Sequence, residues 1–231
     1  MPFETPTAAD VMQWDIVNWS VTLPFWEAQV DWAHARRALE LGGREGGLSL
    51  WLAHRGVDVV CSDLENVATT AAPSHRKFGV EDHVTYEDID ATQIPYENEF
   101  DLIVFKSILG GIGRGGNNAA QQAVIDQAFK ALKPGGTLLF AENLIASPAH
   151  RFLRRRFVKW GDYWHYVSMP GMKNFLQAYT GVQVRTTGVL GTFGRSEGQR
   201  RVLGKVDQAL LNRVVPAEWR YIAYGVARKP A

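Results

Sequence analysis

The segment "ALELGGREGGLSLWLAHRG", residues 38–56, predicts a buried strand, a glycine-rich turn and a helix in direct succession. A turn of this kind presents free backbone N–H groups at the positive end of the helix. The missing side chains also let a ligand approach the backbone closely. We therefore expect a ligand to bind at this turn.

The rest of the chain alternates short β-rich runs with longer helical stretches, as expected of an α/β fold with a largely parallel sheet. The pattern over 117–133 predicts an amphipathic helix that Asn117 caps and that stops before Pro134. With the strand at 37–41, seven strands are expected, the other six near residues 57–62, 83–87, 100–105, 136–143, 182–190 and 220–228.

The length of 231 residues suits one domain with additions. We predict a main domain over 37–231, with a helical insertion at about 195–216 between the last two strands. Residues 1–36 are predicted to form a helical extension, which contains four of the 8 tryptophans. The extension is either a packed cap or a lid over the ligand site.

Composition narrows the class of protein. The formal net charge of +1 gives no overall attraction to nucleic acid, so a nucleic-acid substrate is not expected. Cys61 is the only cysteine and stands in an apolar strand, which indicates core packing and a cytoplasmic protein. No apolar run approaches the ~20 residues that span a bilayer. The oligomeric state is left open.

Two common nucleotide motifs fit the glycine turn poorly. A dinucleotide fingerprint would place Arg44 where a glycine must let the pyrophosphate reach the backbone. A Walker P-loop needs a Lys-Ser or Lys-Thr pair after the glycines, and none follows here. An NAD(P)-dependent oxidoreductase on the same sheet remains an alternative.

In "ELGGREG" (40–46) the chain resembles the class I S-adenosylmethionine-dependent methyltransferases, whose first motif is an acid followed by alternating glycines. Arg44 replaces the middle glycine. Asp63 at the end of the second strand, the Asp90-Ala91 pair and "ALKPGGTLLFAEN" (131–143) follow in the family's order. The resemblance implies a Rossmann-like, doubly wound sheet with helices on both faces and an antiparallel last strand. It also implies that S-adenosylmethionine contacts Glu40, Gly42, Gly43, Gly46, Asp63, Leu64, Asp90 and Ala91.

The resemblance further implies methyl transfer to an oxygen or nitrogen of a small molecule, of natural-product or sugar and glycolipid type. Lys106 stands where metal-dependent relatives carry an aspartate, and a cation there repels a metal. We therefore expect a metal-independent enzyme in which Lys106 supplies positive charge, unless Lys106 simply pairs with Glu142. His165 is the candidate base because imidazole titrates near neutrality. Trp19, Ser107 and Tyr163 are the candidate acceptor contacts.

Other histidines and a basic segment complete the candidates. His150 is a weaker candidate base, whereas His54, His75 and His83 are expected on the surface. The segment from Arg151 to Lys159 is expected to be a solvated helix; an anionic ligand or a membrane surface is the less favoured alternative. A catalytically inactive, methyltransferase-like binding subunit also remains open, with Arg44 as the anomaly that motivates it.

Overall fold

A computed structural model describes residues 3–157 and 164–231. Its centre is one seven-stranded sheet in the order β3-β2-β1-β4-β5-β7-β6, in which only β7 runs antiparallel to its neighbours. This arrangement confirms the predicted Rossmann-like sheet with its antiparallel last strand. The strands are β1 Arg37–Leu41, β2 Asp58–Asp63, β3 Val84–Asp88, β4 Phe100–Lys106, β5 Leu132–Asn143, β6 Thr180–Thr187 and β7 Ile222–Arg228.

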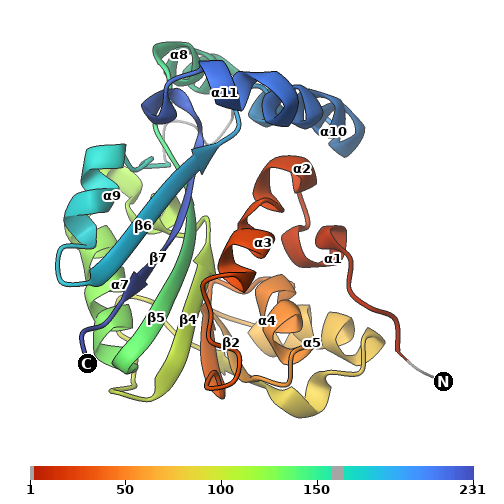
Figure 1. Cartoon of the computed structure of the whole chain (residues 1–231), viewed down its shortest axis with the longest axis vertical. Coiled ribbons are helices and arrows are strands. Elements are labelled where there is room, and N and C mark those ends of the chain that lie inside the picture. Colours follow the sequence, from red (N-terminus) through yellow and green to blue (C-terminus); the bar gives the residue numbers. More distant parts are fainter. Residues whose placement is uncertain (1–2, 158–163) are drawn as a thin grey trace.

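Helices cover both faces of this sheet (Figure 1). The first five pack on one side, and α7 and α9 pack on the other. The α-helices are α1 Ala8–Met12, α2 Ile16–Trp19, α3 Thr22–Glu27, α4 Gly47–Ala53, α5 Val67–Lys77, α6 Leu109–Ile112, α7 Asn118–Ala131, α8 Pro148–Phe157, α9 Met169–Phe175, α10 Glu197–Val206 and α11 Asn212–Val214. Short 3₁₀ turns occupy Glu81–His83, Arg114–Gly116, Gly191–Phe193 and Ala217–Trp219, and a π-helix, Asp207–Leu211, joins α10 to α11.

The order of the strands reverses between β1 and β4. In open α/β sheets, the carboxyl ends of strands at such a reversal flank the crevice where ligands bind. The turn after β1 and the segment after β4 therefore meet at this edge. Both strands are almost wholly buried, as their apolar sequences predict.

Two boundaries differ from the sequence prediction. Asn117 does cap α7, because its Oδ1 accepts a hydrogen bond from the Ala120 N–H at 3.0 Å. The helix ends at Ala131, however, and Leu132 is already extended and pairs with Phe100 of β4. The sixth strand ends at Thr187 rather than near residue 190.

The N-terminal helices pack through their aromatic side chains. Trp26 is fully buried and donates from Nε1 to the Gly225 carbonyl of β7 at 3.0 Å, and Phe25 packs edge-on against Tyr224. Trp32 packs edge-on against Trp51 of α4. This segment is therefore part of the core on that face of the sheet.

A buried polar network ties α2 to the C-terminal helical segment. Asn18 donates from Nδ2 to Asp207 at 2.9 Å and to the Tyr221 hydroxyl at 2.8 Å, and that hydroxyl donates to Asp15. These four side chains are fully buried. At the surface of the network, Glu197 accepts the backbone N–H groups of Asp15 and Ile16, so α10 caps α2. Buried networks of this kind stabilise one arrangement only when each polar group is bonded.

The protonation of Asp15 makes folding depend on pH. Burial raises the pKa of Asp15 from 3.8 to about 7. Between these values the folded chain holds a proton that the unfolded chain has lost, so stability falls as pH rises from 3.8 to about 7. The free energy of unfolding of Asp15→Asn, minus that of the wild type, should therefore rise by more than about 1 kcal/mol from pH ~5 to pH ~8, as measured by urea unfolding. For the exposed control Asp82→Asn, the free energy of unfolding should depend on pH as it does in the wild type. The prediction is contradicted if the free energy of unfolding of Asp15→Asn also changes with pH at the wild-type slope.

Candidate functional site

A cavity of ≈ 980 Å³ lies at the carboxyl ends of β1, β2, β3, β4 and β5. One part of its lining comes from the glycine turn and the ends of β2 and β3. Another part comes from the segments after β4 and β5, from α1 and its following loop, and from α10 and the turn before it. Residues far apart in sequence are thus brought together at the edge where the strand order reverses.

Glu40 shapes the glycine turn from within the protein. Its carboxylate is buried and accepts the Leu48 and Ser49 backbone N–H groups at 3.2 and 2.8 Å, and the Ser49 hydroxyl as well. These bonds fix the N-terminus of α4. Burial raises the pKa of Glu40 to about 7, against the hydrogen bonds from Ser49 that lower it. Glu40 also borders the cavity.

The glycines of the turn are required by space as well as by backbone conformation. Gly42 and Gly46 have φ values of +67° and +70°. A Cβ on Gly42 would lie 2.4 Å from Ile108 Cγ2, and one on Gly46 would lie 2.5 Å from the His75 ring. A Cβ on Gly43 would lie 2.9 Å from the Cys61 sulfur. The turn can therefore pack closely only without these side chains.

Arg44 occupies the position where the family motif has a glycine, and it adopts φ +49°. The turn geometry therefore survives the replacement, at the cost of an unusual backbone conformation for an arginine. Its bonds in the turn come from its backbone: the N–H donates to Asp63 at 2.9 Å, and the carbonyl accepts from Thr70 at 2.7 Å.

The ends of β2 and β3 place the other predicted cofactor residues on the same cavity. Asp63 accepts the N–H groups of Arg44 and Leu64, which orients its carboxylate. Leu64 is 67% exposed although it is apolar. Asp90 accepts the N–H and hydroxyl of Thr92 at 2.8 and 2.7 Å, and Ala91 follows it along the cavity wall. The structure thus brings together Glu40, Gly42, Gly43, Asp63, Leu64, Asp90 and Ala91, while Gly46 lies behind the turn.

Lys106 ends β4 and faces the cavity. Its ammonium lies over the rings of Trp19 and Trp14, at 4.9 and 5.2 Å from their centres. No carboxylate of the described residues forms an ion pair with it, so the alternative pairing with Glu142 is wrong. Burial, with Arg44 nearby, lowers the pKa of Lys106 to about 8.

Glu142 instead caps the short helix α6. Its oxygens accept the Leu109 N–H at 2.7 Å and the Asn143 N–H at 2.8 Å, and burial raises its pKa to about 7. Asn143 reaches the cavity and donates from Nδ2 to the Ser107 hydroxyl at 2.6 Å. Ser107, a predicted acceptor contact, therefore lies on the wall beside Lys106.

The other acceptor predictions fare differently. Trp19 is fully buried and does not line the cavity; Trp14, packed 5.4 Å from it, takes that place. His165 is also absent from the lining, because its Nε2 lies 2.8 Å from Asn118 Oδ1 at the start of α7. Its neighbours Trp164 and Tyr166 do line the cavity, so the role of His165 as a base stays a prediction. Tyr163 and Lys159 lie outside the described residues.

Two further histidines, His75 and His150, are structural. His75, expected on the surface, is fully buried: Nε2 lies 2.8 Å from the Gly46 carbonyl, and the ring stacks on Tyr86. Burial lowers its pKa. His150 is buried as well and is bonded to Ser147 and to the Val189 carbonyl. Neither borders the cavity.

Several lining residues escaped prediction as site residues. Arg154 of α8 is buried, donates to the Leu144 carbonyl at 2.7 Å and lies over the Tyr166 ring at 3.9 Å. Trp164 packs on Gly110 of α6, where a Cβ would collide with its indole. His150 and Arg154 are one helical turn apart and therefore share one face of α8. This spacing is the sequence signal that Arg154 faces inward together with His150. Further unpredicted lining residues, which no local signal distinguishes, include Trp14, Thr192 and Arg200.

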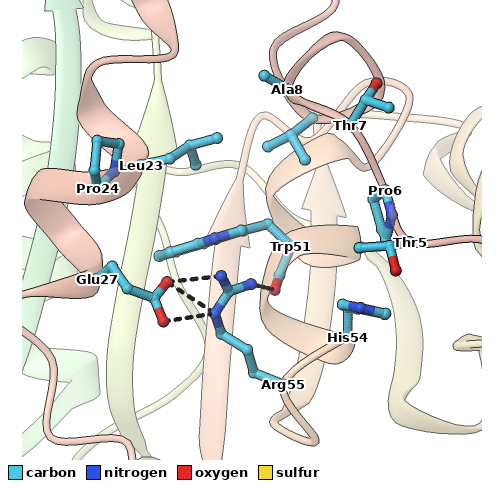
Figure 2. A pocket seen from close by; sticks show the side chains of 11 residues that line it. Thr5, Pro6, Thr7, Ala8, Leu23, Pro24, Glu27, Trp51, His54 and Arg55 are labelled. Carbon is cyan, nitrogen blue, oxygen red and sulfur yellow. Dashed lines mark hydrogen bonds and ion pairs between the residues drawn. The ribbon is translucent and has the colours of Figure 1, made fainter.

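A second cavity of ≈ 320 Å³ lies between residues 5–11, α3 and the end of α4 (Figure 2). Figure 2 shows Arg55 bonded to Glu27 and to the Trp51 carbonyl beside the Trp51 ring. The charges of this ion pair offset each other, and most other lining side chains are apolar or hydroxylic. Val11 borders both cavities, so the N-terminal segment separates them. The smaller cavity contains no catalytic set of side chains.

Comparison with known proteins agrees with this geometry. Residues 39–140 match a family model described as a methyltransferase domain. This match and the Rossmann-like sheet make the segment 39–140 similar to an S-adenosylmethionine-dependent methyltransferase domain. The match covers β1 to β5, which carry the glycine turn, Asp63, Asp90 and Lys106. Comparison of the sequence with curated proteins gives no match.

Solved structures share the fold at low sequence identity. Phosphoethanolamine N-methyltransferase 2 of Haemonchus contortus, in complex with S-adenosyl-L-methionine, has a TM-score of 0.65 at 17% identity; the match covers 97% of this chain and 58% of that one. The YcgJ protein of Bacillus subtilis gives 0.64 at 14%, covering 92% and 99%. The cyclase SpnF gives 0.61 at 18%, covering 92% and 80%. The chain thus spans little more than half of the Haemonchus contortus enzyme.

The residues present fit the cofactor of this methyltransferase domain. Asp63 offers a carboxylate for ribose hydroxyls at the end of β2, and the exposed Leu64 offers an apolar surface for a base. Gly42 leaves its backbone open to the cavity. Lys106 places a positive charge on the cavity wall.

Substitutions in the turn separate the role of Gly42 from that of Arg44. Gly42→Val would meet Ile108 and strain φ, so S-adenosylmethionine affinity should fall by more than about tenfold. Arg44→Gly should leave affinity within about threefold, because the arginine's bonds in the turn come from its backbone. Calorimetry measures both, with Gly56→Val as the control, because Gly56 shares the strained positive φ (+75°) but a Cβ there would meet no atom within 4 Å. Loss of binding in Arg44→Gly would show that the side chain contacts the cofactor.

Proposed function

We propose that this protein transfers a methyl group from S-adenosylmethionine to an oxygen or nitrogen of a small-molecule acceptor, without a metal ion. The single observation that carries the proposal is one cavity with two chemically different halves. The half formed by the glycine turn, β2 and β3 suits the cofactor. The other half, after β4 and β5, leaves room in the same cavity for an acceptor next to the cofactor.

The two halves differ in their charged groups. All three acidic residues of the lining, Glu40, Asp63 and Asp90, belong to the cofactor half, which also holds one cation, Arg44. The acceptor half carries cations and aromatic rings, namely Lys106, Arg114, Arg154, Arg200, Trp14, Trp164 and Tyr166. These groups suit an acceptor that combines an anionic group with an apolar or aromatic part. A phosphorylated acceptor, such as that named for the Haemonchus contortus enzyme complex with phosphomonomethylethanolamine, belongs to this class.

The cofactor supplies a methyl group on a positively charged sulfur, and the protein must align the acceptor with it. Trp14 and Trp164 wall the acceptor half, so they exclude water and orient an apolar ring. Lys106 attracts an anionic group and, with a pKa of about 8, exchanges protons near neutral pH. Two residues support metal independence. Lys106 brings a cation to the position where metal-dependent relatives carry an aspartate, and the oxygens of Glu142 already accept backbone N–H groups.

Two other proposals concern the setting. The N-terminal segment, whose Val11, Gln13 and Trp14 border the cavity, acts as a lid over the site. The described residues contain no helix long and apolar enough to cross a bilayer. The cytoplasmic location and the exclusion of nucleic acid rest on the sequence: the buried lone cysteine and the net charge of +1.

Calorimetry and turnover together test the function. S-adenosylmethionine should bind, NAD should not, and S-adenosylhomocysteine should form with at least one member of a panel of phosphorylated and carboxylated amines and phenols. Turnover should persist after chelation by EDTA. Binding of NAD alone would favour an oxidoreductase. Cofactor binding without turnover would favour a different use of the fold, for which the cyclase SpnF is a structural precedent.

The pH profile of turnover tests Lys106. Its charge is present below a pKa of about 8 and is lost as pH rises through that value, so the affinity for an anionic acceptor should fall above it. Lys106→Arg should keep the acceptor KM flat over this range, and Lys106→Met should raise the KM at least about tenfold at neutral pH. An unchanged KM in Lys106→Met would contradict the proposed contact with the acceptor.

A further inference from the structure

The C-terminal helical segment, residues 195–214, is amphipathic in the reverse of the usual sense. Surface helices normally bury an apolar stripe and expose polar residues. Here the inward face is polar: Asp207 accepts the Leu190 and Gly191 N–H groups, while Gln208 and Asn212 both bond to the Thr187 hydroxyl. The inward face also includes Gly204, where a Cβ would lie 2.9 Å from Val17, so α10 and α2 approach closely.

The outward face carries the apolar residues. Val202, Val206, Leu210 and Val214 recur every fourth residue and are between 40% and 66% exposed. Four residues make slightly more than one α-helical turn, so such a row drifts around a helix. The π-helix Asp207–Leu211 has a wider turn, which offsets the drift and keeps these side chains in one stripe. A continuous exposed apolar stripe of this kind marks an interaction surface.

The exposed charged side chains of residues 195–214 are all cations. Arg195, Arg201, Lys205 and Arg213 are exposed. The two acidic residues of this segment turn inward instead, since Glu197 bonds to the start of α2 and Asp207 belongs to the buried network. The whole chain is nearly neutral, with 25 basic and 24 acidic residues, so this concentration of one sign is local.

The basic helix α8 lies at the same end of the molecule as α10 and α11 (Figure 1). Its sequence holds four arginines and no acid, and Phe152 is 68% exposed beside the exposed Arg151. The inward side of α8 meets the segment that leads into α10, where His150 stacks on Phe193 at 4.9 Å. The two helices therefore combine exposed apolar and basic side chains at one end of the fold.

We propose that this end of the molecule, residues 195–214 with Arg151 and Phe152, docks on an anionic membrane surface. The apolar stripe enters the boundary between headgroups and acyl chains, and the flanking cations attract the anionic lipids. A second copy of the chain fits the face poorly, because a symmetric dimer would place cations against cations. Docking would bring the acceptor half of the cavity near the bilayer, since Arg200 belongs to the docking segment, Arg154 to α8, and Thr192 to the turn just before that segment.

Vesicle flotation tests the proposal on the full chain. The wild type should bind vesicles of phosphatidylcholine mixed with phosphatidylglycerol and should not bind phosphatidylcholine alone. Binding should fall as salt rises from about 0.1 M to about 1 M, where the screening length shrinks from ~10 to ~3 Å. Leu210→Ser/Val214→Ser and Arg201→Glu/Lys205→Glu should each lose at least about tenfold in binding.

Matched controls keep the test specific. Val182→Ser changes an exposed valine on β6, and Arg76→Glu/Lys173→Glu reverses two exposed cations on α5 and α9 with the same change in net charge. Both controls should bind vesicles like the wild type, and thermal unfolding should show that all variants are folded. The proposal is overturned if the wild type does not bind, or if the stripe variants bind as well as the controls. A dimer that Leu210→Ser/Val214→Ser dissociates, without vesicle binding, would assign the stripe to a second copy instead.

Discussion

The buried carboxylate of Glu40 is the interaction on which the site depends. It lies at the end of β1 and accepts the first free N–H groups of α4, so it joins strand and helix across the glycine turn. A buried acid is costly unless its oxygens are bonded, and here the bonds come from backbone and hydroxyl groups that cannot move away. The turn is thereby held open at Gly42 while Asp63 secures its far side through the Arg44 N–H.

A second buried acid plays the same part at the end of β5, two strands away from β1 in the sheet. Glu142 at the end of β5 accepts the Leu109 and Asn143 N–H groups and fixes the start of α6, on which Trp164 packs through Gly110. Two buried acids thus position the two halves of the cavity. Each half then contributes a different chemistry, with exposed carboxylate and apolar surface on one side and cations with indoles on the other.

The N-terminal and C-terminal additions form one unit despite their distance in sequence. Asp15 and Asn18 are linked to Asp207 and Tyr221 inside the protein, and Glu197 caps α2 from outside. The polar network explains why α10 and the π-helix turn their polar residues inward. The apolar residues are left on the outside, which connects the packing of the additions to the proposed membrane contact.

The sequence by itself determined the sheet, the glycine turn and most of the cofactor half. These features depend on local patterns: apolar strands, glycines before a helix, and acids at strand ends. Asp63, Asp90 and Lys106 reach the cavity because the end of a parallel strand has only one edge of the sheet to occupy. Local pattern also indicated the cap at Asn117, because that cap is made within one helical turn.

Only the tertiary structure decided the acceptor half. Trp14 rather than Trp19 borders the cavity, Arg154 turns inward, and Thr192 and Arg200 arrive from the last helical segment. Lys106 does not pair with Glu142, the alternative that the sequence left open, but lies on two indoles of the N-terminal segment. The ring of His165 is bonded to Asn118 at the start of α7, a contact that the sequence did not indicate. These placements depend on packing between segments far apart in sequence, and a pattern of neighbouring residues does not encode which distant side chain fills a given space.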